Sequence, residues 1–597
     1  MKKILKETNQ KGITLVALVV TIIIVLILAA ISIQALTNTG IFAQANNAKR
    51  ESEIANIKEK IALDIYEKQL EPPLGSITEE QLIEILNKYF KDVPETLPED
   101  LSTLTLTTKA EYGNYSIKVS DVYSGGTAED TRTLLADGSW NSSKNVNSPK
   151  LMDGMTGIYW DASGNEVTVT VDNQDNWYDY SQQKWANAKT EDGSYWVWIP
   201  RYEYKITTPY TSTASTISVK FIPTTQTTVD SEYTYIHPAF ENGSASGKNN
   251  NYMNGEWDAE IPGFWVAKYP AGFQANTITK NAGTLSTTIS NSSDTVVYSD
   301  KKYTSYHTDM TTNALGQNLT SSGYSSQKLS YPVFKPLTYA YNNISTGDAY
   351  TISQEIKNAT SFYGLNSTKT DSHQMKNSEW GAVAYLTQSS YGRSGTEVNM
   401  NNYYTSTSSP WRTAITGVYA NSTGTSSTTT LGKPYNESTV GVKGSSTANI
   451  TGVYDLNGCV WERTAAYISN GTGNLSTYGS SYAVTSANTN GYKTLSTKYA
   501  TVYPYNSSDT NANNYNTYKG LKSSTYGYGD AVLETSTSGV NSTSWNGDYS
   551  YFPYTTSPFF LRGGWCSDTT YAGAFAFDHD HGDPDYVIGF RAVLVGV

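Results

Sequence analysis

Residues 559–597 alternate short apolar segments with polar and aromatic ones. The sequence Ala574-Phe575-Ala576-Phe577 has a period of two, and residues 588–594 repeat that period with Ile, Phe, Ala and Leu. Such alternation predicts half-buried antiparallel strands. Residues 578–586 between them carry a Gly, a Pro and almost no apolar side chain. They are therefore predicted to form a surface loop that presents side chains to a partner.

Five short segments, one of them containing a Glu-Trp pair, carry a resemblance to a known family. They are Gly263 to Tyr269, Lys376 to Gly381, Tyr454 to Glu462, Arg562 to Gly564 and Ile588 to Arg591. The residues of these segments and the order of the segments resemble the formylglycine-generating-enzyme (sulfatase-modifying) family, a variant of the C-type-lectin fold. The resemblance implies an early strand at the first segment, a helix at the second, and a β-rich, loop-rich lectin-like domain over residues 191–597. The strand-like segment Ser194 to Tyr202 opens this domain.

The composition favours an extracellular, mostly β protein. Only 16% of the 597 residues are charged, 48 are Tyr, and Ser, Thr, Asn and Gly abound, which is unlike an ordinary cytosolic enzyme. The net charge of −12 argues against a nucleic-acid partner, since phosphate binding needs a basic surface. Cys459 and Cys566 allow at most one disulfide, so one bridge or two buried thiols is expected.

An apolar run at residues 13–33 is long enough to span a bilayer, and the basic segment at residues 1–12 precedes it. The basic prefix keeps the N-terminus on the cytoplasmic side, which predicts a single-pass membrane protein with an extracellular domain. A cleaved signal peptide and a plain anchor are the alternatives. The run lacks the short apolar region and small-residue cleavage site of an ordinary signal peptide.

The junction of Lys11-Gly12 with Ile13 and the apolar residues after it resembles the class III prepilin signal of type IV pilins and pseudopilins. The resemblance implies a leader at residues 1–12, cleavage between Gly12 and Ile13, and contacts with other pilin subunits in a pilus. Major pilins have Glu at the fifth mature position, where this chain has Ala17. A minor or tip pilin is therefore favoured.

Isoleucines at spacings of three and four extend the expected pilin-type helix over residues 13–71. They are Ile54, Ile57, Ile61 and Ile65. Pro72-Pro73 ends this helix, and Ser76-Ile77-Thr78-Glu79 has the form of a capping box that opens a short helix to about Phe90. Residues 72–190 are then expected to form a spacer of this helix and short β segments. The fold class is α+β.

The family resemblance raises an enzymatic function, which depends on two thiols. The family's best-known members oxidise a substrate cysteine with two thiols that follow the Arg-Gly-Gly segment, and the matching positions here hold Asp568 and Gly573. A copper-thiolate site needs soft sulfur ligands that this segment does not supply, because Cys566 lies elsewhere. The chain is therefore predicted not to be an enzyme, with a sulfatase-modifying-type oxidase as the alternative.

The same resemblance implies a calcium site formed by the side chains of Asp455 and Glu462 and the carbonyl groups of Gly458 and Val460. All four supply hard oxygen ligands, as calcium requires. In the structural alternative, Asp455 caps a turn and Glu462 is a buried acid. A transition-metal site at residues 578–581 is disfavoured, because in an extended strand the two Asp face away from the two His.

The end of the chain also resembles the variable proteins of diversity-generating retroelements, which share the lectin-like fold and alternate invariant Gly, Phe, Ala and Arg with substituted residues. The resemblance implies that the substituted positions bind a ligand. They are Trp565, Cys566, Ser567, Asp568, Tyr571, Asp578, His579, Asp580, His581, Asp583, Asp585 and Tyr586. All except Trp565 are reachable by changing the adenines of an Asn codon. A fixed fold with polar loops is the alternative.

These features together predict a surface-displayed, pilin-like adhesin or receptor-binding protein whose ligand is a protein or a glycan. Aromatic and acidic side chains on rigid strands supply contact area and hydrogen bonds at low entropic cost, as in antibody paratopes. A structural minor pilin without a specific ligand is the remaining alternative.

Overall fold

The computed structural model divides the chain into two compact units, Met1–Thr133 and Leu134–Val597. It describes residues 41–69, 77–98, 101–123, 134–243, 256–272, 296–298, 301–303, 331–338, 340–342, 344–403, 414–419, 433–469, 473–479, 498–521 and 528–597. The prepilin leader, the cleavage site at Gly12 and Ile13 and the apolar run at residues 13–33 lie outside these ranges. Among the described residues, no helix has the length and apolar character needed to cross a bilayer.

The first unit packs helix α2 (Ile41–Gln69) against helix α3 (Glu79–Tyr89). The isoleucine stripe faces this contact, since Ile57, Ile61 and Ile65 are at most 5% exposed. The described part of the predicted helix arm and its apolar face are thus confirmed. A hairpin of β1 (Thr105–Thr107) and β2 (Ser116–Lys118) completes the unit's core through Leu106 and Ile117.

Helix α3 begins two residues later than the Ser76 capping box predicts. Its N-cap is Thr78, whose hydroxyl accepts from the Gln81 amide at 3.3 Å while the Gln81 side chain accepts from the Thr78 amide at 2.9 Å. The segment therefore contains a second capping pattern, Thr-x-x-Gln, and both of its hydrogen bonds form.

The second unit contains two seven-stranded sheets, the first of which is antiparallel throughout. Its strands in spatial order are β15 (Thr370–Gln374), β25 (Ala592–Gly596), β12 (Gly263–Ala267), β8 (Tyr195–Pro200), β7 (Asn187–Thr190), β5 (Met155–Trp160) and β6 (Glu166–Thr168). The strands expected at Ser194 to Tyr202 and Gly263 to Tyr269 are confirmed. Residues 134–190, which the sequence analysis assigns to a spacer, supply β5 to β7 and belong to this unit.

The second sheet contains the other strands of residues 559–597, namely β22 (Phe559–Gly563), β23 (Gly573–Asp580) and β24 (Ile588–Phe590). Its strands in order are β19 (Thr501–Tyr503), β18 (Trp461–Ile468), β22, β23, β21 (Tyr549–Ser550) and β20 (Ser542–Thr543), with β24 also beside β18. The antiparallel prediction is wrong for β24, which pairs with β18 in parallel. Residues 588–594 are not one strand either, because the chain leaves this sheet at Arg591 and enters the first as β25.

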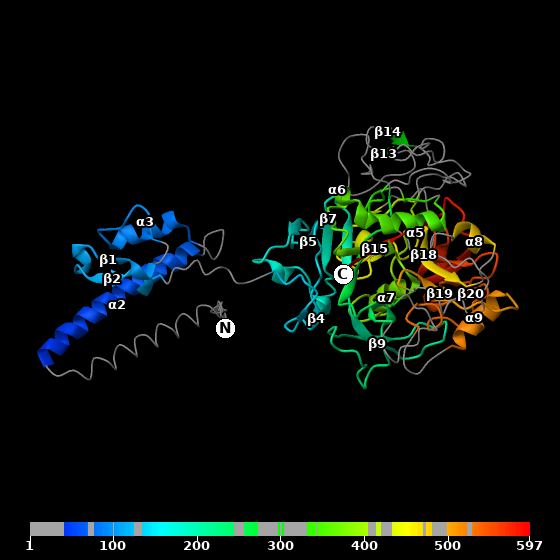
Figure 1. Ribbon diagram of the computed structural model, residues 1–597, viewed down its shortest axis with the longest axis horizontal. Helices are drawn as coiled ribbons and strands as arrows, with labels where there is room; N and C mark the ends of the chain where they lie inside the picture. The colour runs from blue at the N-terminus through cyan, green and yellow to red at the C-terminus, as the bar shows by residue number, and fades with distance from the viewer. Residues whose placement is uncertain are drawn as a thin grey trace, which may run out of the picture. The chain divides into compact units, whose positions relative to one another are not determined.

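Smaller sheets and helices surround these two. The small sheets are β10 (Ile217–Phe221) with β9 (Tyr202–Ile206) and β11 (Tyr235–Ile236), β3 (Trp140–Asn141) with β4 (Val146–Asn147), β13 (Val296–Tyr298) with β14 (Lys301–Tyr303), and β16 (Val418–Tyr419) with β17 (Lys433–Pro434). The helices are α5 (Thr346–Glu355), α6 (Thr360–Tyr363), α7 (Asn377–Gln388), α8 (Asn474–Tyr478) and α9 (Asn511–Lys519). Both α5 and α7 contact β18 (Figure 1). The unit is therefore mixed α+β and mostly sheet.

Strand β23 is buried on both faces rather than on one. Ala574, Phe575, Ala576 and Phe577 are all at most 5% exposed. Helix α7, the helix expected around a Glu-Trp pair, reaches this strand through Trp380, whose indole donates to the Ala574 carbonyl at 2.7 Å. Burying each Phe contributes about 1.5–3 kcal/mol. The half-buried prediction is wrong because period two places Ala and Phe on opposite faces but cannot tell whether a second layer covers the Ala face.

Candidate ligand-binding face

The predicted ligand-binding residues lie in three consecutive pieces of the second sheet. Trp565 to Tyr571 connect β22 to β23, Asp578 to Asp580 end β23, and His581 to Tyr586 connect β23 to β24. The loop expected at residues 578–586 is thus wrong for its first three residues. They pair with β22, with Asp578 opposite Leu561 and Asp580 opposite Phe559. The ladder extends into polar residues because β22 is long enough to supply their backbone partners.

Solvent exposure distinguishes the candidate ligand-binding positions of this segment from the apolar residues between them, as the sequence predicts. Of the twelve candidate positions only Cys566 is buried, and Tyr571 is 52% exposed. The apolar segments between them are buried, including Phe559 and Phe590. The alternation in sequence is therefore an alternation between core and surface.

Strand geometry places Asp578 and His579 on opposite sides of β23. His579 packs edge-on between two tyrosines, with ring centroids 4.4 Å from Tyr551 and 5.0 Å from Tyr554. Burial lowers the pKa of His579 to about 4, so the ring is neutral near pH 7. The His and Asp side chains here do not converge, and among the described residues no three His, Cys, Asp or Glu are grouped closely enough to hold a metal ion.

Five residues form a continuous surface, here called the tail face: Tyr549, Trp565, Asp568, Tyr571 and Asp578. Tyr549 and Trp565 pack against the same apolar cluster of Trp461, Leu561, Ala576 and Ile588. The rings of Tyr549 and Tyr571 have centroids 6.1 Å apart. The Trp565 amide donates to Asp568 Oδ2 at 2.8 Å. The face therefore combines aromatic rings with two carboxylates.

The two carboxylates of the tail face are partly desolvated. Burial raises the pKa of Asp578 to about 7, and the charges of Asp568 and Asp580 add to the effect. Burial also raises the pKa of Asp568. Among the described residues, neither acid forms an ion pair with a Lys or Arg. Neither carboxylate is therefore neutralised by a basic side chain in this part of the chain.

The other acids of the segment have partners that hold the chain. Asp580 forms an ion pair with the buried Arg463 of β18 and accepts from the Gly582 amide at 2.6 Å. Arg463 also donates to the Asp583 carbonyl. Asp585 accepts from the Val587 amide at 2.9 Å and closes the turn before β24. These interactions stabilise the loop that leads to Tyr586, whose ring lies 6.2 Å from that of Trp565.

Strand β21 and the residues that follow it contribute side chains that the sequence did not indicate. Tyr549, Tyr551 and Tyr554 border the candidate residues but precede residue 559. The spacing of Tyr549 and Tyr551 is itself a period-two signal. It did not identify their location, because β21 joins β23 through a parallel pairing of Ser550 with Phe577.

The residues of the expected calcium site are arranged differently from an open metal site. Asp455 is fully buried with a φ of 60°. Its Oδ1 accepts from the Asn401 amide at 2.9 Å and the Tyr419 hydroxyl at 2.8 Å, and its Oδ2 accepts from the Gly417 amide at 2.8 Å. Every donor comes from the protein, so Asp455 acts as a buried hub for three segments.

Glu462 is likewise occupied. Its two oxygens accept from Arg591 Nε at 2.9 Å and from an Arg591 terminal nitrogen at 2.6 Å, a bidentate pair in which both residues are at most 1% exposed. Arg591 also donates to the carbonyls of Ala267 and Tyr454. As placed, the side chains of Asp455 and Glu462 do not fit a calcium ion beside Gly458 and Val460. The Arg591 guanidinium already supplies the positive charge beside Glu462.

The two cysteines are not bridged and lie in one apolar cluster. Cys459 and Cys566 are fully buried together with Val460, and the Cys566 amide donates to the Cys459 carbonyl at 3.1 Å. Burial raises the pKa of Cys459 well above its ordinary value. Of the two arrangements left open by the sequence, the structure has two buried thiols without a bridge.

A scan against models of known protein families finds no match to the chain, and a search of curated proteins finds no relative.

Proposed function

We propose that the chain is a surface-displayed, pilin-like adhesin or receptor-binding protein that binds its ligand through the tail face. The proposal includes the lectin-like fold, the membrane anchor at residues 13–33 and an extracellular position, all of which come from the sequence. The observation that carries it is the separation of this segment into a buried apolar scaffold and a set of aromatic and acidic side chains that are half-buried or, at Tyr571, exposed.

The chemistry of the face favours a ligand that presents a cationic group. Asp568 and Asp578 lie among the rings of Trp565, Tyr549 and Tyr571, and carboxylates with aromatic faces are the surroundings that ammonium and guanidinium groups prefer. A lysine- or arginine-bearing protein surface, or an amino sugar, has this property. Because the pKa of Asp578 is about 7, binding should strengthen as the pH rises through neutrality.

The test uses the full-length chain in detergent micelles, screened on an array of glycans and an array of surface proteins. A hit is then measured with a variant that carries Trp565→Ala and Tyr571→Ala. We expect a loss of affinity of tenfold or more, since aromatic anchors dominate such interfaces. The matched control is Val229→Ala, which removes an apolar side chain that is 40% exposed but lies outside the tail face.

The proposal is contradicted if the double variant binds the hit as tightly as the parent chain, or if neither array yields a hit. Either outcome would favour a structural pilin without a specific ligand.

The proposed diversification has its own test. The DNA beside the gene should contain a near-copy of the coding region for residues 559–597 that differs at adenines, next to a reverse-transcriptase gene. Without such a copy, the tail face is a fixed recognition surface.

A further inference from the structure

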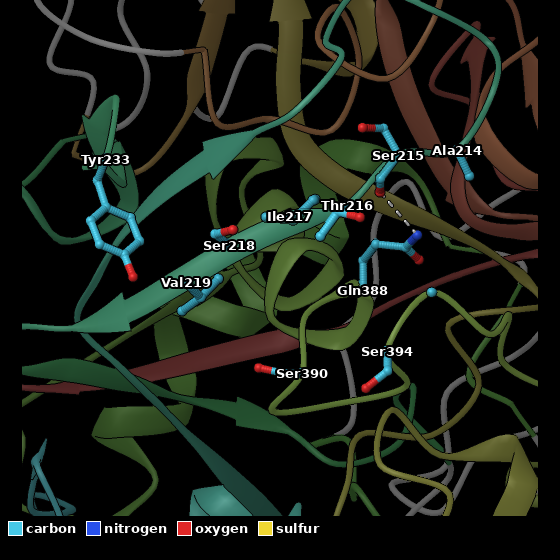
Figure 2. A pocket seen from close by; sticks show the side chains of 11 residues that line it. Ala214, Ser215, Thr216, Ile217, Ser218, Val219, Tyr233, Gln388, Ser390 and Ser394 are labelled. Atoms are coloured by element: carbon cyan, nitrogen blue, oxygen red, sulfur yellow. Dashed lines mark hydrogen bonds between the residues drawn. The ribbon is translucent and has the colours of Figure 1, made fainter.

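Strand β10 lies at an edge of the three-stranded sheet β10-β9-β11 and borders an open groove of about 560 Å³. Figure 2 shows the strand on one side and Gln388, Ser390 and Ser394 on the other. The groove lies well within the range of volumes found for ligand sites. It shares no residue with the tail face.

Hydrogen bonding shows which backbone groups of β10 face the groove. The Thr207 amide donates to the Thr216 carbonyl at 3.0 Å, and the Ile222 amide donates to the Arg201 carbonyl. In an antiparallel pair, residues bond to the partner strand in alternation, so Thr216, Ser218 and Lys220 direct their amide and carbonyl groups toward β9. Ile217 and Val219 consequently direct theirs toward the groove. Within the part of the chain that the structure describes, no hydrogen bond links these groups to another residue.

Gln388 provides independent evidence that this edge is open. The same alternation points the Ser215 carbonyl into the groove, where the Gln388 side-chain amide donates to it at 3.4 Å (Figure 2). A side-chain amide therefore takes the place that a neighbouring strand's N–H would hold. The next outward-facing groups along β10, those of Ile217 and Val219, have no such cap.

The walls of the groove are small and uncharged. Ser215, Ser218, Ser390 and Ser394 supply hydroxyl groups, Tyr233 stands at one end, and no charged side chain is among the described residues that line it. Small side chains leave room for another backbone to approach the strand. An open edge of this kind binds extended peptides by adding a strand to the sheet.

We propose that the open edge of β10 binds an extended segment of another polypeptide, with small uncharged side chains, as an additional strand. The alternating donors and acceptors at Ile217 and Val219 repeat every two residues, a spacing that matches extended backbone. A sugar presents hydroxyl groups without that repeat. This site is separate from the proposed adhesive face and stands or falls independently of it.

The experiment pans a phage library of random dodecapeptides on the full-length chain in detergent and measures the recovered peptides against two variants. Val219→Pro removes an N–H that points into the groove, and Pro is tolerated at an edge strand in that orientation. Ser390→Arg places a large side chain across the groove from an exposed position and leaves the core intact. We expect each variant to weaken binding at least tenfold.

Two controls separate this result from unfolding and from binding elsewhere. Ser218→Pro removes an N–H that bonds to β9, so it should lower the melting temperature more than Val219→Pro, which keeps that ladder and loses only part of a buried apolar side chain. Trp565→Ala on the tail face should leave peptide binding unchanged. If Val219→Pro unfolds the chain, the effect of Ser390→Arg on peptide binding alone tests the proposal. Peptides whose binding survives Ser390→Arg, a library that yields no binder, or a glycan that occupies the groove instead would each overturn the proposal.

Discussion

Two pairs of acids in the second unit show how differently one sheet treats a carboxylate. Asp455 and Glu462 are fully buried, and each is saturated by donors from the protein. Asp568 and Asp578 are partly exposed and lack a basic partner among the described residues. The first pair stabilises the fold, whereas the second is available to a ligand. Sequence resemblance pointed to both pairs as binding residues, and only the surroundings separate them.

The largest effect should follow from removing the cation that serves the buried pair. Arg591→Ala leaves Glu462 buried without its counter-charge, so the free energy of unfolding should fall by about 3–5 kcal/mol. Urea denaturation followed by tryptophan fluorescence measures this change. The matched control is Lys189→Met, which breaks the partly exposed pair with Glu166 and should cost at most about 1 kcal/mol. Equal losses in the two variants would contradict the comparison.

A smaller loss is expected at Asp455. Asp455→Ala leaves the buried donors of Asn401, Gly417 and Tyr419 without an acceptor, so the free energy of unfolding should fall by about 2–3 kcal/mol. Asp455→Asn keeps one acceptor oxygen and suits a φ of 60°, so it should cost less. If Asn and Ala were equally harmful in urea titrations, the carboxylate charge rather than its hydrogen bonds would be what matters.

Removing an acid from the tail face should raise the free energy of unfolding instead of lowering it. The folded chain holds the pKa of Asp578 at about 7, above its unfolded value, so ionisation destabilises the fold as the pH rises from about 4 to 7. Asp578→Asn should therefore match the parent at pH 4 and exceed it by about 1–2 kcal/mol at pH 8, because solvent screens a partly exposed charge. Unfolding curves at several pH values test this. A variant less stable than the parent at pH 8 would assign Asp578 a structural role.

Calcium should produce the smallest effect. Since Arg591 already occupies Glu462, adding millimolar calcium or the chelator EGTA should leave the melting temperature of the full-length chain unchanged. Differential scanning fluorimetry with magnesium as the control salt measures this. A rise in melting temperature specific to calcium would restore the site that the resemblance implies at Asp455, Gly458, Val460 and Glu462, and would remove the distinction between the two pairs of acids.

Local patterns predicted the parts of the fold that depend on local geometry. The spacing of Ile57, Ile61 and Ile65 predicted the buried face of α2, and period two predicted the strand at Ala574 to Phe577. The resemblance to variable proteins pointed to Trp565, Asp568, Tyr571 and Asp578, four of the five residues of the tail face. Pairings between distant residues were not predictable in this way. Glu462 and Arg591 are 129 positions apart, and nothing in either neighbourhood indicates that they meet.

Strand length accounts for a second kind of error. Asp578, His579 and Asp580 were expected in a loop because their side chains are polar, but their backbone groups continue the ladder with β22. Sequence reports what a side chain prefers, whereas strand length depends on whether a neighbour supplies backbone partners. The contribution of Tyr549 was missed for the same reason.

The passage of the chain from one sheet to the other at Arg591 has a consequence for synthesis. Strand β25 lies between β15 and β12 in the first sheet, although it is made after every other strand of that sheet. A nascent chain interrupted before residue 592 would lack an interior strand of that sheet and would be a target for proteases.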